Sequence, residues 1–206
     1  MSSIMKQLEE RIAEFEKGTL FSIQDFCDTT SYSTVKKSLQ RLEKQNKIMR
    51  AIDGIYLSPS CSTLTGERFL PAPENIAQYI AKKNKWSIAP SGNRCLNILG
   101  LSTQLPMEYV YVCDGPSRRY DYLGTPITFK HVPQKEIRDI SIASAVVIQA
   151  LKILGKDHVD DDIIRQIRDR LSHEEKEQIL RECVGITKWI RSYIESICGS
   201  EICRNS

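Results

Sequence analysis

The feature that most constrains this chain is a cationic segment followed directly by a hairpin signal, SYSTVKKSLQRLEKQNKIMRAIDGIYLSP, at residues 31–59. Residues 31–50 carry six basic groups and one acid, a net charge of +5, whereas residues 1–30 carry three basic groups and six acids, a net charge of −3. The whole chain has a net charge of only +3. Such a swing between neighbouring segments is the local pattern expected of a nucleic-acid-binding surface.

The apolar residues of this segment recur at helical spacing. A helix capped by Ser31 or Ser33 and running to about Asn46 places Val35, Leu39 and Leu42 in one narrow stripe at about 100° per residue. The basic side chains lie opposite that stripe, and short polar and aromatic residues stand at the helix start, where a recognition helix meets base edges. The candidate DNA-contacting residues are therefore Tyr32, Ser33, Thr34, Lys36, Lys37, Gln40, Arg41, Lys44, Lys47 and Arg50. An ordinary solvated helix face is the alternative.

The flanking segments predict a winged helix-turn-helix in residues 1–65. Residues 4–15 have helical apolar spacing, and Ser22 with Asp25 resembles a capping box that opens a short second helix. After the basic helix, Asp53-Gly54 predicts a type I′ hairpin turn, which needs positive φ at both positions. Arg50 would then share a side with apolar residues, so either its side chain snorkels outward or a bulge changes the alternation. The acidic Asp53 at the turn would repel phosphate.

The remainder, residues 66–206, predicts a mixed α/β domain with a helical C-terminal end, so the expected fold class is α+β. A connector rich in Ser, Thr, Pro and Gly precedes it. We expect a helix from Pro73, a short helix at 93–99, and strands at 109–113 and 126–132. IASAVVIQALKIL, at residues 142–154, is apolar nearly all round and predicts a buried helix ended by Gly155.

Basic residues of this second domain form a further set of candidates for anion contact. Arg118 and Arg119 fall in the polar stretch between the two strands, where paired arginines of a loop can grip phosphate or carboxylate. A solvated loop explains them equally well. The full set is Arg94, Arg118, Arg119 and Lys130.

Other chemistry has little support in the sequence. The seven cysteines include no CxxC pair, so we expect reduced thiols and no metal. HVDDD, at residues 158–162, could suggest metal ligands, but acids at a helix start complement the helix dipole. Phosphate-binding loops and nucleophile elbows are absent. We therefore expect no enzyme activity and no cofactor. With no secretory signal and no membrane-spanning run, we expect a cytoplasmic protein.

Two stretches, FSIQDF…TVKKSLQRLEKQNKIMRAIDGIYLSP and APENIAQYIAKKNKWSIAPSGNRCLNILGLSTQLPMEYVYVCDGPSRR, together resemble AbiEi-type antitoxins and regulators of type IV toxin–antitoxin systems, linked to abortive infection. The resemblance covers roughly residues 5–155, and residues 90–106 are its more specific part. It implies a DNA-binding N-terminal domain that represses its own operon. It also implies a C-terminal domain that counters a nucleotidyltransferase-like toxin encoded beside it, without need of a stable complex.

The sequence thus predicts a DNA-binding repressor of the antitoxin class, with double-stranded operator DNA as its partner and a monomer or dimer on that DNA. A protein-interaction module without specific DNA binding is the alternative. A small nucleic-acid-modifying enzyme with HVDDD as metal ligands is a third hypothesis.

Overall fold

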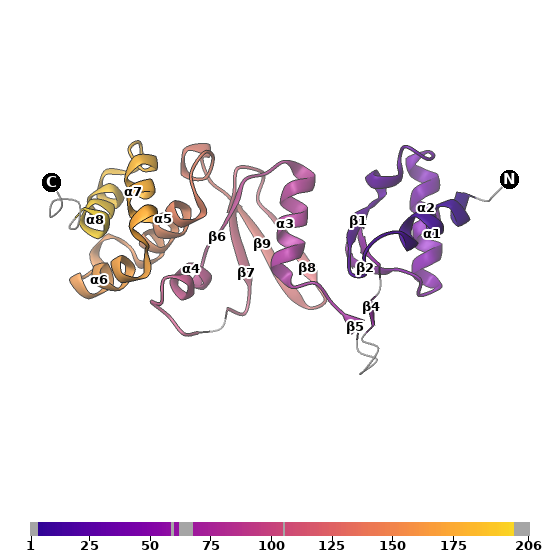
Figure 1. Ribbon diagram of the computed structural model, residues 1–206, viewed down its shortest axis with the longest axis horizontal. Coiled ribbons are helices and arrows are strands. Elements are labelled where there is room, and N and C mark those ends of the chain that lie inside the picture. Colours follow the sequence, from indigo (N-terminus) through magenta and orange to yellow (C-terminus); the bar gives the residue numbers. More distant parts are fainter. Residues whose placement is uncertain (1–3, 59, 62–67, 105, 200–206) are drawn as a thin grey trace. The chain divides into compact units, whose positions relative to one another are not determined.

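The computed structural model describes residues 4–58, 60–61, 68–104 and 106–199 (Figure 1). The chain forms two compact units, Met1–Ile80 with Asp121–Gly124, and Ala81–Tyr120 with Thr125–Ser206. The predicted domain boundary between residues 65 and 66 falls outside the described residues. The molecule is a mixed α+β protein, as the sequence predicts.

The first unit combines helices with a small antiparallel sheet. The strand order is β1-β3-β2, so the strand that follows the first helix pairs with the last strand of the hairpin. A two-stranded ribbon, β4 (Ser60–Cys61) with β5 (Arg68–Phe69), follows. The main elements are α1 (Ile4–Ala13), β1 (Leu20–Ser22), the 3-10 helix η1 (Ile23–Phe26), α2 (Tyr32–Lys44), β2 (Met49–Ile52) and β3 (Ile55–Leu57).

One apolar core holds these elements together. It contains residues from both helices, from the 3-10 turn and from the sheet, and it includes three phenylalanines whose rings contact one another. The fully buried members of α2 are Val35, Leu39 and Leu42, the predicted apolar stripe. The stripe fixes how α2 is rotated about its axis, because any other rotation would expose these three side chains to water.

Helix α2 ends in a left-handed cap. Asn46 has a φ of 58°, and its N–H donates to the carbonyl of Glu43 while the N–H of Lys47 donates to the carbonyl of Leu42. This is the pairing of a Schellman motif, in which asparagine tolerates the left-handed conformation better than most residues. The helix therefore stops at Lys44, two residues before the predicted end.

The β2–β3 hairpin differs from the predicted type I′ turn. Gly54 has a φ of 73°, but Asp53 does not have a positive φ. The pairing register shifts between Arg50 and Ile52. This shift is a β-bulge, one of the two arrangements that the sequence allows for Arg50. The bulge lets Arg50 face solvent while Ala51 and Ile52 stay buried.

The second unit has a four-stranded sheet of order β6-β7-β9-β8. β6 pairs antiparallel with β7, and β7 pairs parallel with β9. Helix α3 (Pro73–Asn84) leads into this unit and buries Ile76, Ala77 and Ile80. The strands are β6 (Ile88–Pro90), β7 (Tyr109–Cys113), β8 (Arg118–Tyr122) and β9 (Thr125–His131).

Helices make up the rest of the second unit. α5 contacts α4, α7, α8 and β6, and α8 contacts α6 and α7 (Figure 1). Every residue of α5 from Ser144 to Leu151 is buried, as predicted for an all-apolar helix. The helical elements are α4 (Asn93–Ile98), η2 (Gln134–Glu136), α5 (Ile142–Leu154), η3 (Lys156–His158), α6 (Asp161–Arg170), α7 (His173–Glu182) and α8 (Lys188–Cys198).

Five strands are absent from the sequence-based prediction, β1, β4, β5, β6 and β8, and β4 and β5 lie in the segment predicted as a connector. β1 and β6 are each three residues long, too short for an alternating pattern to stand out. β8 was predicted as a polar loop carrying Arg118 and Arg119, and this prediction is wrong. β8 is the edge strand beside β9, and an edge strand tolerates charged side chains because water reaches them. Among the described residues, no helix combines the length and apolar character needed to cross a membrane.

Candidate nucleic-acid interface

The outer face of α2 gathers most of the predicted DNA-contacting residues. Tyr32, with 55% of its surface exposed, begins the helix. Thr34 is half-buried, and the remaining candidates of this helix are exposed, namely Ser33, Lys36, Lys37, Gln40, Arg41 and Lys44. Because the opposite stripe is buried, this face is held toward solvent by the packing of the core.

The cationic groups on this face of α2 have no acidic partner within the part of the chain that the structure describes. Among the residues that the structure describes, Lys36, Lys37, Arg41 and Lys44 form no ion pair, whereas Lys47 and Arg50 each form one. The charges of these side chains are therefore accessible from solvent without loss of an ion pair to another described residue.

The start of α2 is a small hydroxyl cluster. The Ser31 hydroxyl lies 3.2 Å from that of Ser33 and 2.9 Å from that of Thr34. The Ser31 side chain makes no capping hydrogen bond to the backbone, although its carbonyl accepts from the N–H groups of Thr34 and Val35. Exposed hydroxyls at the end of an exposed helix have the chemistry to contact bases or phosphates.

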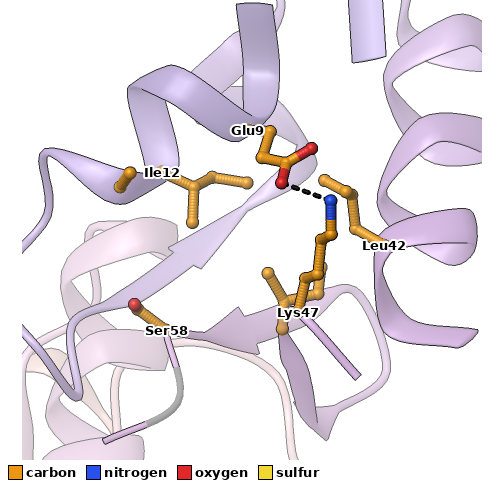
Figure 2. A pocket seen from close by; sticks show the side chains of 7 residues that line it. Glu9, Ile12, Leu42, Lys47 and Ser58 are labelled. Carbon is orange, nitrogen blue, oxygen red and sulfur yellow. Dashed lines mark hydrogen bonds and ion pairs between the residues drawn. The ribbon is translucent and has the colours of Figure 1, made fainter. Parts of the chain in front are cut away.

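Two further candidates have partners of their own. Lys47 lies beyond the end of α2, and its ammonium pairs with the Glu9 carboxylate of α1 (Figure 2). The pair stands beside a hollow of about 260 Å³ whose lining includes Ile12, Leu42 and Ser58. Such a volume is below the usual range of ligand pockets. Lys47 therefore lies apart from the unpaired charges of α2.

Arg50 pairs with the acid at the hairpin turn. Its guanidinium Nη2 lies 2.6 Å from Oδ1 of Asp53, whose side chain is 93% exposed. The pair offsets the negative charge that the sequence places at the turn. An exposed pair of this kind is weak, and screening by salt weakens it further. Arg50 is thus available to phosphate only in competition with Asp53.

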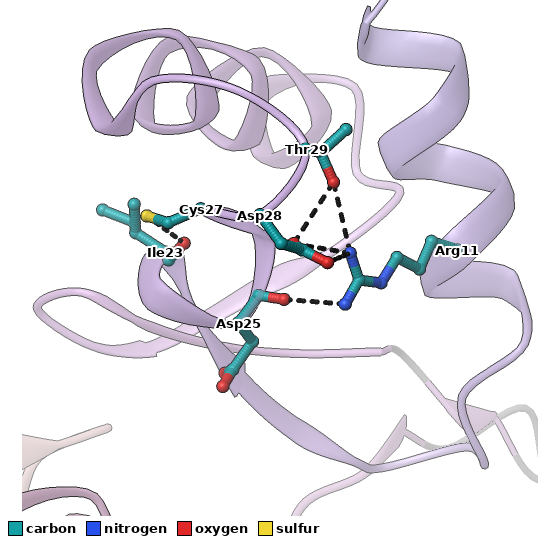
Figure 3. Close-up of polar contacts among 6 residues, drawn as sticks. All are labelled: Arg11, Ile23, Asp25, Cys27, Asp28 and Thr29. Carbon is teal, nitrogen blue, oxygen red and sulfur yellow. Dashed lines mark hydrogen bonds and ion pairs between the residues drawn. The ribbon is translucent and has the colours of Figure 1, made fainter.

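The turn between η1 and α2 is held by a residue that the sequence analysis does not single out. Arg11 of α1 donates from Nη1 to both carboxylate oxygens of Asp28, each at 2.8 Å, and to the Thr29 hydroxyl at 3.2 Å (Figure 3). Its Nη2 donates to the carbonyl of Asp25 at 3.0 Å. Arg11 is separated from these residues by fourteen to eighteen positions, so no local pattern reveals the contact.

The hydrogen bond from Arg11 lowers the pKa of the Asp28 carboxyl below its ordinary value, and it outweighs desolvation, which acts to raise the pKa. Asp28 is therefore a carboxylate at neutral pH, and its charge is matched by the guanidinium that it binds. Asp28 therefore adds no unpaired negative charge beside the basic face of α2.

The basic candidates of the second unit do not form one cluster. The Arg118 guanidinium lies 5.7 Å from the Trp86 ring centroid, and that of Arg94, on α4, lies 5.5 Å from the Tyr109 centroid. Arg119 and Lys130 are exposed on the neighbouring strands β8 and β9. Successive residues of a strand point to opposite faces, so Arg118 and Arg119 lie on opposite faces of β8 and not side by side in a loop.

The described part of the chain contains no group of three or more histidine, cysteine or acidic side chains that could hold a metal ion. Five cysteines, Cys27, Cys95, Cys113, Cys183 and Cys198, are free thiols, and all of these except Cys27 are buried. Burial raises the pKa of Cys95 to about 12 and those of Cys183 and Cys198 to about 11. Thiols of this kind are packing residues and not nucleophiles at neutral pH.

Comparison with known proteins adds a family and a fold. The model of the DUF6088 family, a family of unknown function, matches residues 7–179. No curated protein matches the chain. One similar solved structure is the crystal structure of the RV2827C protein from Mycobacterium tuberculosis, with a TM-score of 0.52 and 10% sequence identity. The match covers 97% of this chain and 77% of that one, and at this identity it concerns the fold alone.

Proposed function

The chain belongs to the DUF6088 family, and from that premise we propose that it is a double-stranded-DNA-binding transcriptional repressor that reads its operator with α2. The observation that carries the proposal is the exposed face of α2, where Lys36, Lys37, Arg41 and Lys44 are exposed and unpaired within the described residues. Oppositely charged i,i+4 pairs stabilise solvated helices, but none of these four side chains forms such a pair within the described residues.

The finer assignment of the first unit as a winged helix-turn-helix is part of this proposal. It is supported by the order of elements, in which a helix and a short strand precede η1, the turn, α2 and the β2–β3 hairpin. The strand order β1-β3-β2 supports it further, because it lays the hairpin beside the helices as a wing. In this arrangement α2 is the recognition helix.

The side chains of α2 divide into two roles. Lys37, Arg41 and Lys44 neutralise phosphates, which sets affinity and its dependence on salt. Tyr32, Ser33, Thr34 and Lys36 lie at the helix start, where base edges are read. A single helix of this size reaches few phosphates, so tight binding requires two copies on repeated half-sites or help from the second unit.

The test is a fluorescence-anisotropy titration on DNA from immediately upstream of the chain's own coding sequence, at several salt concentrations. Five phosphate contacts would give a log–log salt slope of about −4.5. The double variant Lys37→Ala/Arg41→Ala should bind more weakly and with a slope shallower by about 1.8, which corresponds to two lost contacts.

A matched control is Lys82→Ala/Lys83→Ala, which removes the same charge from exposed positions of α3. This control should retain the slope of the unaltered protein. Equal affinities for the α2 double variant and the unaltered protein would remove α2 from the interface, and with it the proposal.

The resemblance to AbiEi-type antitoxins supports a second part of the proposal, that the protein represses its own operon and counters a nucleotidyltransferase-like toxin encoded beside it. Co-expression with the adjacent gene, scored by growth, tests this part. Lys37→Ala/Arg41→Ala should lose repression of a promoter reporter while still restoring growth. Failure of the unaltered chain to restore growth would leave a DNA-binding regulator that is not an antitoxin.

One observation favours a second candidate function, a protein-interaction module. A hollow of about 380 Å³ in the second unit has an apolar floor that includes Leu99, Val146 and Leu171. At its rim, Ile142 is 67% exposed. Co-purification with a neighbour-encoded protein, together with no DNA retardation at low salt, would favour this function over DNA binding.

A further inference from the structure

The turn that leads into α2 has few contacts of its own. Cys27, Asp28 and Thr29 are exposed, and their backbone N–H bonds are local, from Cys27 to Gln24 and from Thr29 to Phe26. Phe26, which is fully buried, anchors one end of the turn, and the N-cap residue Ser31 begins α2 at the other. The path of residues 27–30 therefore decides where the hydroxyls of the helix start are placed.

Arg11 supplies the long-range contacts of this turn. Its guanidinium makes four hydrogen bonds, to the Asp25 carbonyl, both Asp28 oxygens and the Thr29 hydroxyl, and lies 5.2 Å from the centroid of the Phe26 ring (Figure 3). A planar guanidinium suits this task because it presents several donors in fixed directions. Since its donors face the turn, Arg11 is bound to the protein and is not a phosphate contact.

We propose that Arg11 is a specificity-determining positioning residue, which fixes the η1–α2 turn so that the start of α2 meets base edges in one geometry. This inference rests on the proposed function, because it assumes that α2 is the recognition helix. Arg11 touches no base. It acts through Asp28 and Thr29 on the placement of Ser31, Ser33 and Thr34.

The two roles of α2 respond differently to a loosened turn. Lysine and arginine reach phosphates with long side chains and tolerate small displacements of the helix. Short hydroxyls at base edges do not, because a hydrogen bond weakens steeply with distance and angle. Loss of Arg11 should therefore reduce discrimination between operator and random DNA, and leave non-specific binding and its salt slope nearly unchanged.

The experiment measures the affinity of the full chain for two duplexes, the DNA immediately upstream of its own coding sequence and a shuffled duplex of the same composition. Arg11→Ala would also expose the Asp28 charge, so the decisive variant is Arg11→Ala/Asp28→Asn, which frees the turn without adding a negative charge. Its ratio of upstream to shuffled affinity should fall about tenfold, roughly the effect of one mismatched base pair. Its affinity for the shuffled duplex should stay within about twofold of the unaltered protein, since phosphate contacts set non-specific binding.

Lys6→Ala/Glu10→Gln is the matched control, since it likewise removes one positive and one negative charge, here from an i,i+4 pair of α1 whose charged groups lie 3.8 Å apart. This variant should keep the full ratio. Circular dichroism establishes that each variant is folded, and a loss of affinity for both duplexes together would indicate general damage and overturn the assignment to specificity.

Two outcomes separate this inference from the function on which it rests. If the unaltered chain discriminates between the duplexes and Arg11→Ala/Asp28→Asn discriminates equally well, the positioning role is wrong and the proposed function stands. If the unaltered chain does not discriminate at all, both are wrong.

Discussion

Two helices of thirteen residues, α2 and α5, show how similar beginnings lead to different uses. Each starts after a serine, Ser31 or Ser141, in extended backbone conformation. α5 buries eight consecutive residues, whereas α2 buries four, all on one side. α5 packs inside the second unit, whereas α2 packs with one side and leaves the other exposed to solvent.

The N-terminal caps of the two helices also differ in how far their polar groups are bound within the protein. The Ser141 hydroxyl accepts from the Ser144 N–H, and one carboxylate oxygen of Glu182 accepts from the Ser141 N–H at 2.7 Å and from the hydroxyls of Ser141 and Ser144. Within the described residues, the hydrogen-bond partners of the Ser31 hydroxyl are the hydroxyls of Ser33 and Thr34. The N-terminus of α5 has its polar groups bound within the protein, so it serves the packing of the fold. The hydroxyls at the N-terminus of α2 remain at the surface, where a ligand can reach them.

The largest expected contrast is between a buried side chain of α5 and an exposed side chain of α2. Leu151→Ala removes a side chain of α5 that is 0% exposed, so the free energy of unfolding should fall by about 2–5 kcal/mol. Gln40→Ala, on the exposed face of α2, should change it by less than about 0.5 kcal/mol. Denaturant titration of both variants provides the measurement. Equal losses of stability for the two variants would mean that the Gln40 side of α2 is buried in solution and not exposed.

A smaller contrast is expected at the caps. Ser141→Ala removes a backbone-capping oxygen and a donor to Glu182, so it should lower the free energy of unfolding by about 1–2 kcal/mol. Ser31→Ala should cost less than about 0.5 kcal/mol, because no backbone hydrogen bond of its side chain is lost. Thermal unfolding of the two variants in parallel would show the difference. A greater loss for Ser31→Ala would reverse the comparison of the caps.

The smallest expected effect is on pH dependence. Burial acts to raise the pKa of Glu182, but hydrogen bonds from Ser144, Ser141 and Gln178 outweigh it and hold the pKa below the ordinary value of 4.5. The stabilisation is thus fully present above the unfolded pKa and is lost as the pH falls through the lower, folded pKa. Glu182→Gln should destabilise the protein at pH 7 and approach the stability of the unaltered protein near pH 3.

Glu43→Gln, on α2, is the matched substitution for this pH series, because its carboxylate accepts no hydrogen bond within the described residues. Its stability should follow that of the unaltered chain at both pH values. A Glu182→Gln variant whose deficit stays constant from pH 7 to pH 3 would show that the carboxylate charge does not contribute to the α5 cap.

Local periodicity was sufficient for the long helices and for the strands with strong β propensity. The thirteen residues of α5 coincide with the predicted apolar run, and β7 coincides with YVYVC. The same reasoning failed for β1, β6 and β8. These strands are three to five residues long; β1 and β6 pair with β3 and β7, which lie elsewhere in the sequence, and β8 lies beside the strand that follows it, β9. Strand pairing, and not the residues' own preference, makes such segments extended.

The sequence by itself determined which residues of α2 face the core and which carry charge, because a helix of fixed period leaves one arrangement for a three-residue apolar stripe. Only the tertiary structure decided which of those charges are unpaired. Glu9 and Asp53 engage Lys47 and Arg50, and Arg11 is directed to the turn at Asp28. The physical reason is that ion pairing depends on distances between residues, some far apart in the chain, and no local pattern encodes these distances.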